Sequence, residues 1–444
     1  MRSLRWGAIA IVVCVAPAWG QSFEGPNILS RGGRSLGRSG GRQVRFTGFA
    51  AVGVSYYDGL SLAKRSDQGG VPDESAYGGS ASFGLSGSRA DRRSTTSGGY
   101  SGSMVLFNSQ SNYSGLNQQA SINHARQLSR RWSMFTGVSA GSFATVLGLN
   151  RTPFSQSYFE QPVAAGTEVF DTRIYQFSGG AGLSYQKSAR LTFSMSGGGS
   201  TQRFNSTALV GYQGFFSSGE VSYALSRRTG IGGVYTFGTS YFRRGYGESL
   251  FHTAGFTFQR RLSRIWSTGG SLGFYRAETD RLQQQAIDPL IAALTGQTTA
   301  VFAHHAVNYG RAISLGLGGT FRTSSVHIGY TGGLSPGNGI YLTSDSHNAG
   351  VQYNYTGFRR VGFSASADYT KFRPLLPGFE GQRNFEAYGG GAGISYRLFS
   401  VVHLAFNAAI RRSQFDSNSN FSRDRYYLGA SLAFSPGELP LLPW

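Results

Sequence analysis

The side chains best suited to acid–base or metal chemistry are seven histidines and one close pair of carboxylates. Glu278 and Asp280 are two positions apart, so on a β-strand they would share one face. One histidine opposite them could take part in proton transfer. His304 and His305 are adjacent, however, and neighbouring strand residues point to opposite faces, so the two cannot both bind one metal ion. We therefore interpret these residues as part of a solvated entrance.

Other catalytic patterns are weaker still. The glycine runs 197–199 and 389–391 are not followed by the Lys-Ser/Thr of a phosphate-binding loop, which favours glycines that relieve crowding at a strand bend or bulge. The single cysteine, Cys14, falls in the N-terminal segment, so thiolate chemistry is not expected in a processed chain. The sequence predicts no catalytic residue, no metal site and no cofactor, and hence a protein that is not an enzyme.

The first 43 residues differ from the rest of the chain. Residues 1–20 carry Arg2 and Arg5, then an apolar run, then Ala18-Trp19-Gly20, which is typical of a secretory signal peptide cleaved after Gly20. Residues 21–43 are rich in Gly, Ser and Arg without periodicity, which predicts a flexible periplasmic extension.

Composition narrows the fold class of the remainder. Charged residues make up 14% of the chain, against about 25% in soluble domains. After the first twenty residues no stretch supplies the roughly 18 apolar residues of a spanning helix. Alternating polar and apolar positions with many Gly, Ser, Tyr and Phe instead favour an all-β transmembrane antiparallel barrel over residues 44–434. A half-buried soluble sheet has the same period, but the small polar residues of the opposite face favour a wet lumen.

Short basic connections punctuate the chain and predict β-hairpins. The clearest is Leu128-Ser129-Arg130-Arg131-Trp132, and related turns fall near residues 91, 129, 188, 227, 263, 323, 358 and 399. Eight short periplasmic turns imply nine longer extracellular loops and about eighteen strands, in a range of roughly 14 to 20. The longest loops are expected at 148–170 and 278–303. Within the second, Asp288 and Pro289 could start a short helix that Gly296 ends.

Alternation also identifies candidate lumen-facing residues. In one predicted strand, Leu404, Phe406 and Ile410 alternate with polar residues, and in another Ala365 and Ala367 do so. The opposite, lumen-facing positions include four residues that can carry charge or donate hydrogen bonds: Asp368, His403, Asn407 and Arg411.

The last predicted strand carries the most specific motif, Tyr427-Leu428-Gly429-Ala430-Ser431-Leu432-Ala433-Phe434. It resembles the C-terminal insertion signal of bacterial outer-membrane β-barrels, in which a glycine is followed by apolar residues at the third and fifth positions. The resemblance implies an outer-membrane location, contact with outer-membrane lipid and recognition by the barrel-assembly machinery through Tyr427, Gly429, Leu432 and Phe434. Residues 435–444 are rich in proline and are expected to form a tail that cannot extend the sheet.

The net charge of the chain indicates which kind of solute it would favour. Its formal net charge is +20, and lysine occurs only at positions 64, 187 and 371, so arginine dominates. Arginines at turns also reach naturally towards a membrane interface. The sequence thus predicts a porin-like passive channel that favours anionic solutes and has no nucleic-acid partner. Two alternatives are an export pore for an acidic exopolysaccharide, because the chain also looks like arginine-rich pores of that class, and a non-conducting surface scaffold.

Overall fold

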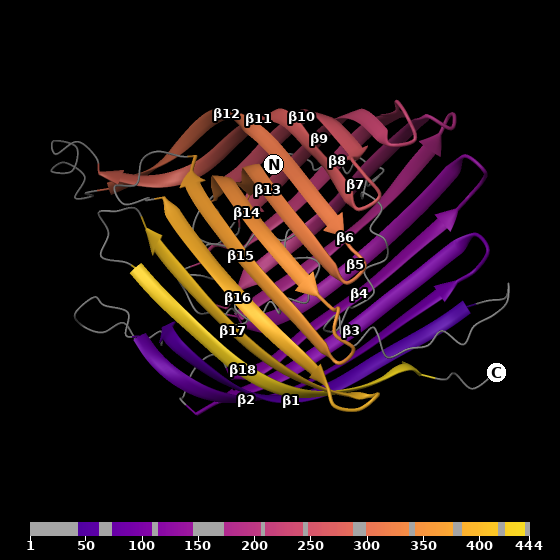
Figure 1. Cartoon of the computed structure of the whole chain (residues 1–444). Coiled ribbons are helices and arrows are strands. Elements are labelled where there is room, and N and C mark those ends of the chain that lie inside the picture. Colours follow the sequence, from indigo (N-terminus) through magenta and orange to yellow (C-terminus); the bar gives the residue numbers. More distant parts are fainter. Residues whose placement is uncertain are drawn as a thin grey trace.

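The computed structural model of the protein is an eighteen-stranded antiparallel β-sheet that closes into a barrel (Figure 1). It describes residues 43–61, 73–108, 114–144, 173–205, 209–242, 247–286, 299–336, 342–375, 384–415 and 422–439. Within these ranges each strand pairs with its neighbours in sequence, and β1 pairs with both β2 and β18. The predicted barrel and its strand number are confirmed. In the same ranges no helix is long and apolar enough to cross a bilayer.

The bounds of the eighteen strands are β1 (Gln43–Ser61), β2 (Asp73–Ala90), β3 (Ser94–Phe107), β4 (Gly115–Gln127), β5 (Trp132–Ala144), β6 (Arg173–Gln186), β7 (Leu191–Phe204), β8 (Tyr212–Ala224), β9 (Thr229–Phe242), β10 (Gly247–Arg261), β11 (Trp266–Ala286), β12 (Thr299–Thr320), β13 (Ser324–Pro336), β14 (Thr343–Tyr355), β15 (Val361–Pro374), β16 (Phe385–Arg397), β17 (Val402–Phe415) and β18 (Ser422–Leu439).

Eight short connections lie at one end of the barrel, which we call the turn end; the opposite end is the loop end. The serine of the repeated Leu-Ser-Arg motif stabilises the turn through its hydroxyl group. The backbone N–H groups of Ile265 and Trp266 donate to Ser263 Oγ at 3.1 and 3.0 Å, and Ser129 Oγ accepts two equivalent bonds. A serine hydroxyl that accepts nearby backbone N–H groups replaces a missing turn bond. The basic residue next to it is not needed for this geometry.

Side-chain alternation separates two faces of the wall. Large apolar residues such as Val54, Ile122 and Phe406 are exposed on the outer face. The intervening positions are small or polar, and many are buried, as with Ser196, Ser364 and Ser395. Because backbone hydrogen bonds are satisfied around the closed sheet, the apolar outer face can lie in a bilayer.

Aromatic side chains concentrate on the outer face towards both ends. At the turn end, the ring centroids of Trp132 and Tyr185 are 4.8 Å apart, and those of Trp266 and Phe321 are 5.6 Å apart. At the loop end, exposed tyrosines form the second belt: Tyr77, Tyr175, Tyr241, Tyr309, Tyr369, Tyr388 and Tyr426. Paired aromatic girdles around an apolar band are typical of transmembrane barrels.

The last strand is longer than predicted. β18 continues past Phe434 to Leu439, and Phe46, Thr47 and Gly48 of β1 pair with its final residues. The prediction that residues 435–444 cannot extend the ladder is therefore wrong for 435–439. A register shift between Gly48 and Ala50 leaves Ser435 and Pro436 together at a bulge, where a proline without an N–H group is tolerated. β1 also starts at Gln43, one residue before the expected barrel boundary.

The predicted loop 278–303 is also corrected. β11 continues to Ala286 and β12 begins at Thr299, so Glu278, Asp280 and Leu282 belong to a paired strand. The inferred helix around Asp288, Pro289 and Gly296 lies outside the described residues. So do the predicted signal peptide 1–20, nearly all of the extension 21–43, the loop 148–170 and residues 440–444.

The β11–β12 hairpin leaves the barrel wall near the loop end. β12 pairs with β13 only from Ile313 to Thr320, while its earlier residues pair with β11 alone. Above this point the lumen-side residues of β11 contact β14, three strands further on, and Thr279 Oγ1 lies 3.1 Å from Thr343 Oγ1. Both threonines are buried. The hairpin therefore overlaps the neighbouring strands instead of extending their sheet.

Candidate functional site

The four candidate lumen residues lie on the face opposite the exposed apolar side chains. Phe406 and Ile410, at even positions of β17, are exposed, whereas His403 and Arg411, at odd positions of the same strand, are buried. Asp368 lies on β15, and its side chain is 11% exposed. The strands thus present charged groups on the inner face of the wall, close to the loop end in the case of Asp368 and Arg411.

Asp368 and Arg411 form an ion pair that crosses a strand. Arg411 Nη1 donates to Asp368 Oδ2 at 2.6 Å, and the arginine side chain is 7% exposed. Between them lies Gly389 of β16, which pairs with Asp368 on one side and with Arg411 on the other. A Cβ at Gly389 would lie 2.9 Å from the Ile410 carbonyl oxygen and 3.4 Å from both Arg411 Cγ and Nη1. Glycine therefore leaves room for the guanidinium to reach over β16.

The role of the glycine run 389–391 follows from this contact. These residues pair regularly with β15 and β17, without the bend or bulge that the sequence suggested. The run relieves crowding, as expected, but at Gly389 it does so for a side chain from the next strand. An ion pair with so little solvent contact needs good geometry, because desolvation of both charges opposes it.

Two further arginines extend the cluster, and sequence analysis did not single them out. Arg425 of β18 pairs directly with Arg411, and Arg423 lies two residues along on the same face. They are 3% and 2% exposed. Arg423 Nε donates at 2.7 Å to the carbonyl of Gly59, whose φ of 74° occurs beside an irregularity in β1. The sequence does contain a signal for them: Arg423 and Arg425 alternate with Asp424 and Tyr426, which places both arginines on one face of the strand.

His403 and Asn407 do not join this cluster. His403 is fully buried nearer the turn end and pairs in register with Arg397. Asn407 pairs with Gly393 on one side and Gly429 on the other. Of the four predicted residues, the structure brings only Asp368 and Arg411 into direct contact.

The proposed insertion-signal residues occupy both faces of β18. Leu432 and Phe434 are exposed on the outer face. Tyr427 points inward, and its ring centroid lies 4.9 Å from that of Tyr57. The Tyr427 ring also lies against Gly429, where a Cβ would not fit. An aromatic ring covering a strand glycine stabilises the sheet locally.

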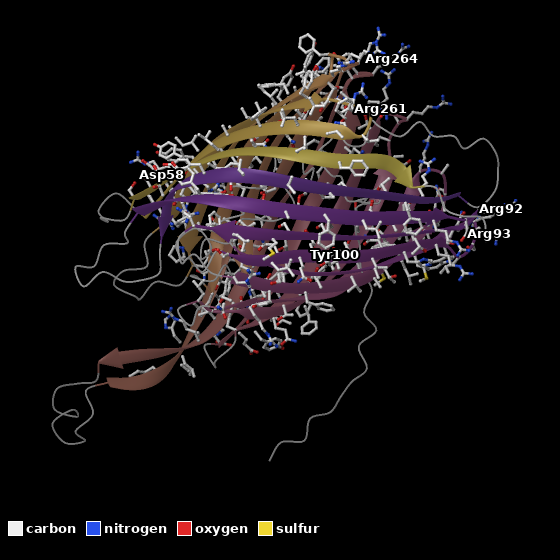
Figure 2. All side chains as sticks on the ribbon, turned by 90° about the horizontal axis from the view of Figure 1, so that it is seen from below. Asp58, Arg92, Arg93, Tyr100, Arg261 and Arg264 are labelled. Atoms are coloured by element: carbon white, nitrogen blue, oxygen red, sulfur yellow. The ribbon has the colours of Figure 1, made fainter. Side chains whose placement is uncertain are left out.

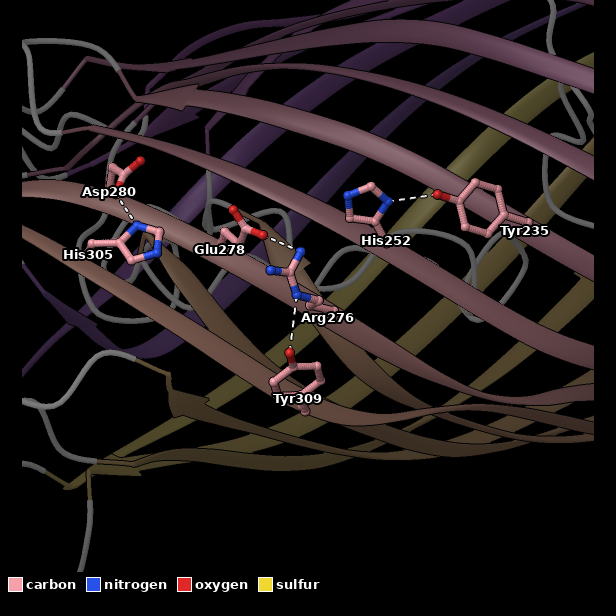
Figure 3. Close-up of polar contacts among 7 residues, drawn as sticks. All are labelled: Tyr235, His252, Arg276, Glu278, Asp280, His305 and Tyr309. Carbon is pink, nitrogen blue, oxygen red and sulfur yellow. Dashed lines mark hydrogen bonds and ion pairs between the residues drawn. The ribbon is translucent and has the colours of Figure 1, made fainter.

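A polar ladder runs over the outer face of β9 to β12 (Figure 3). His305 Nδ1 lies 2.6 Å from Asp280 Oδ1, and Tyr235 Oη lies 2.7 Å from His252 Nδ1. Between these pairs, Arg276 contacts Glu278 and donates to Tyr309 Oη at 3.2 Å.

The structure thus brings one histidine opposite the paired carboxylates, as the sequence allowed, while His304 lies on the other face. Asp280 and His305 are both more than half exposed, so neither is desolvated as a catalytic group would be. Among the described residues no group of three His, Cys, Asp or Glu side chains could hold a metal ion.

Tyr275 makes the same kind of crossing as Arg411. It is buried on the lumen side of β11, and its ring lies against Gly310 of β12, where a Cβ would not fit. Its hydroxyl hydrogen-bonds with Asp345 of β14. Asp345 Oδ2 in turn lies 3.1 Å from His347 Nε2. This network holds the β11–β12 hairpin against β14.

Known proteins offer a broad likeness only. No protein-family model matches the sequence, and no curated protein matches it. Solved structures similar to this chain include Pseudomonas aeruginosa OccK2 (OpdF), with 12% identity and a TM-score of 0.43, covering 88% of this chain and 98% of that one. A BenF-like porin from Pseudomonas fluorescens Pf-5 has 13% identity and a TM-score of 0.41, with the same coverage. Acinetobacter baumannii OccAB3 has 11% identity and a TM-score of 0.42, covering 88% and 99%. At these values the likeness does not identify a family or a solute.

The architecture itself defines the location. A closed antiparallel sheet of even strand number has an apolar outer wall, aromatic belts near both ends and a polar inner wall. Closure leaves no unpaired strand edge in the hydrocarbon, which is the condition for spanning a bilayer with strands. The chain is a transmembrane barrel of the bacterial outer membrane.

Proposed function

We propose that the barrel is a passive outer-membrane channel that favours anionic solutes. The observation that carries this proposal is the inner-wall arginine cluster of β17 and β18: Arg411, Arg423 and Arg425, with Asp368 as the carboxylate of the group. Among the described residues, this group holds three guanidinium groups and one carboxylate.

The position of the cluster strengthens its effect. Buried charges are screened less by salt than exposed ones, and a wall of low dielectric focuses their field into the aqueous space. Arg411 is held by Asp368, and Arg423 is held by the Gly59 carbonyl. Fixed arginines attract an anion through their field without first having to reorganise.

The cluster lies near the loop end, which we propose faces the cell exterior. The short connections would then be periplasmic, as in other barrels of this class. A solute arriving from outside would meet the basic wall early in its path. The described contacts support a role in attracting solutes rather than in chemistry, because they supply fixed positive charge.

Single-channel recording in planar bilayers tests whether the barrel conducts. The purified protein should give discrete conductance steps, and heat-denatured protein should give none. A folded, heat-modifiable barrel that inserts without any conductance would favour the non-conducting scaffold and reject the channel.

A further inference from the structure

The turn end carries a ring of positive charge. The eight short connections, all described in the structure, contain one acidic residue, Asp91, which pairs with Arg89 at 3.3 Å. Figure 2 shows Arg92, Arg93 and Arg264 at this end and Asp58 at the other. The same connections contain twelve exposed cations: Arg92, Arg93, Arg130, Arg131, Lys187, Arg190, Arg227, Arg228, Arg264, Arg322, Arg359 and Arg360.

The ring follows most of the circumference and leaves a gap at β18 and β1, which no short connection joins. Seven of the eight connections contribute at least one of these cations, and the remaining one, 398–401, directly follows Arg397. Arg397 Nη2 donates at 3.1 Å to the Arg359 carbonyl of the neighbouring turn. Since the strands pair in sequence around a closed barrel, successive connections lie side by side around its rim.

Among the described residues near the loop end, cations and carboxylates lie together. Several cations there lie beside a carboxylate, including Arg276 with Glu278, Lys371 with Glu386, and Arg412 with Asp424. At the turn end, by contrast, the eight connections hold twelve exposed cations and one acidic residue.

Apolar side chains occupy the same connections as the cations. Leu225 precedes Arg227, Ile265 follows Arg264, and Phe358 precedes Arg359, and all three apolar residues are exposed. The aromatic belt with Trp132 and Trp266 begins directly beyond them. Apolar groups beside long cationic side chains match the boundary between acyl chains and headgroups.

We propose that this ring binds the anionic phosphate headgroups of phospholipids in the leaflet at the turn end. A protein partner would cover a patch of about 800 Å² on one side of the rim, whereas the cations are spread over seven connections around most of it. All but one of its cations are arginines, which bind phosphate through two parallel hydrogen bonds. Lipid headgroups are the anions that are present at this level around the entire barrel.

The test uses the full-length protein folded in phosphatidylcholine vesicles containing spin-labelled phosphatidylglycerol or spin-labelled phosphatidylcholine. Electron paramagnetic resonance measures the relative association of the two labels with the protein. The wild type should select phosphatidylglycerol, and high salt should weaken that selection. Substitution of the four adjacent arginine pairs by glutamine should bring the ratio to parity: Arg92 and Arg93, Arg130 and Arg131, Arg227 and Arg228, Arg359 and Arg360.

Two double variants that remove the same charge from different ends of the barrel show whether lipid selection depends on the turn end or on net charge alone. Arg130→Gln/Arg227→Gln should lower the ratio, whereas Arg276→Gln/Arg412→Gln removes the same charge near the loop end and should preserve it. Heat-modifiable mobility confirms that each variant is folded. A wild type without preference, or equal losses in both double variants, would overturn the proposal. The proposal would also be overturned if the protein showed no lipid preference but bound polyglutamate in a salt-sensitive manner. That result would assign the ring to an acidic polypeptide.

Discussion

Arg411 reaches across an entire β-strand to pair with Asp368, with 2.6 Å between Nη1 and Oδ2. The strand that it crosses presents Gly389 at the crossing point. Tyr275 crosses β12 at Gly310 to reach Asp345 in the same manner. In both places strands that are not neighbours in the sheet interact directly beside a glycine, and this stiffens the wall beyond its backbone ladder.

The ion pair predicts a non-additive response to substitution. Asp368→Asn should lower the free energy of unfolding by about 3 kcal/mol, because it leaves a desolvated guanidinium without its carboxylate. Arg411→Gln should have a similar cost, and the double variant should cost clearly less than the sum. Urea unfolding in lipid vesicles measures this double-mutant cycle. Strictly additive losses would show that the two charges do not stabilise each other.

The turn serine should contribute measurably to stability. Ser263→Ala removes the acceptor for two backbone N–H groups and should cost about 1 kcal/mol of unfolding free energy. Ser217→Ala, at an exposed strand position, serves as the control and should be nearly neutral. Equal effects in the two variants would argue that the Ser263 hydroxyl does not support the turn.

The terminal strand predicts an assembly defect. Phe434→Ala should reduce the yield of heat-modifiable barrel in cells if this aromatic residue is read during insertion. Phe406→Ala removes an equally exposed outer-face ring from the preceding strand and controls for lost lipid contact. Truncation after Leu439 should have little effect, since the paired residues remain. A defect with Phe406→Ala but not with Phe434→Ala would reject the proposed signal.

Sidedness can be tested by cysteine labelling of intact cells. A cysteine at Ala303, exposed on the projecting hairpin, should react with an impermeant maleimide, whereas a cysteine at Ser129 should react only after lysis. The opposite pattern would place the turn end outside the cell and reverse the proposed direction of solute entry.

Much of the fold could be predicted because barrel signals are local. Each strand shows its own alternation, and each short, mostly basic connection marks a reversal, so an approximate strand number follows from one pass along the chain. The continuation of β18 was missed because a bulge accommodates Pro436, and bulges depend on the partner strand.

The site was harder to predict because it depends on three strands together. The alignment of Asp368, Gly389 and Arg411 follows from the registers of β15, β16 and β17, which no single segment encodes. The contact between Thr279 and Thr343 arises only after β12 separates from β13. Alternation alone predicts that Arg423 and Arg425 share one face of the last strand. That strand was interpreted only through its insertion motif.

The reversal potential in a salt gradient is the most direct test of an anion-favouring channel. The wild-type protein in a planar bilayer should give a potential of the sign expected for anion selectivity. Arg423→Gln/Arg425→Gln should move it towards zero, while Arg276→Gln/Arg412→Gln, with the same charge removed from the outer face, should leave it close to the wild-type value. A cation-selective wild type, or an unchanged potential in Arg423→Gln/Arg425→Gln, would contradict the account.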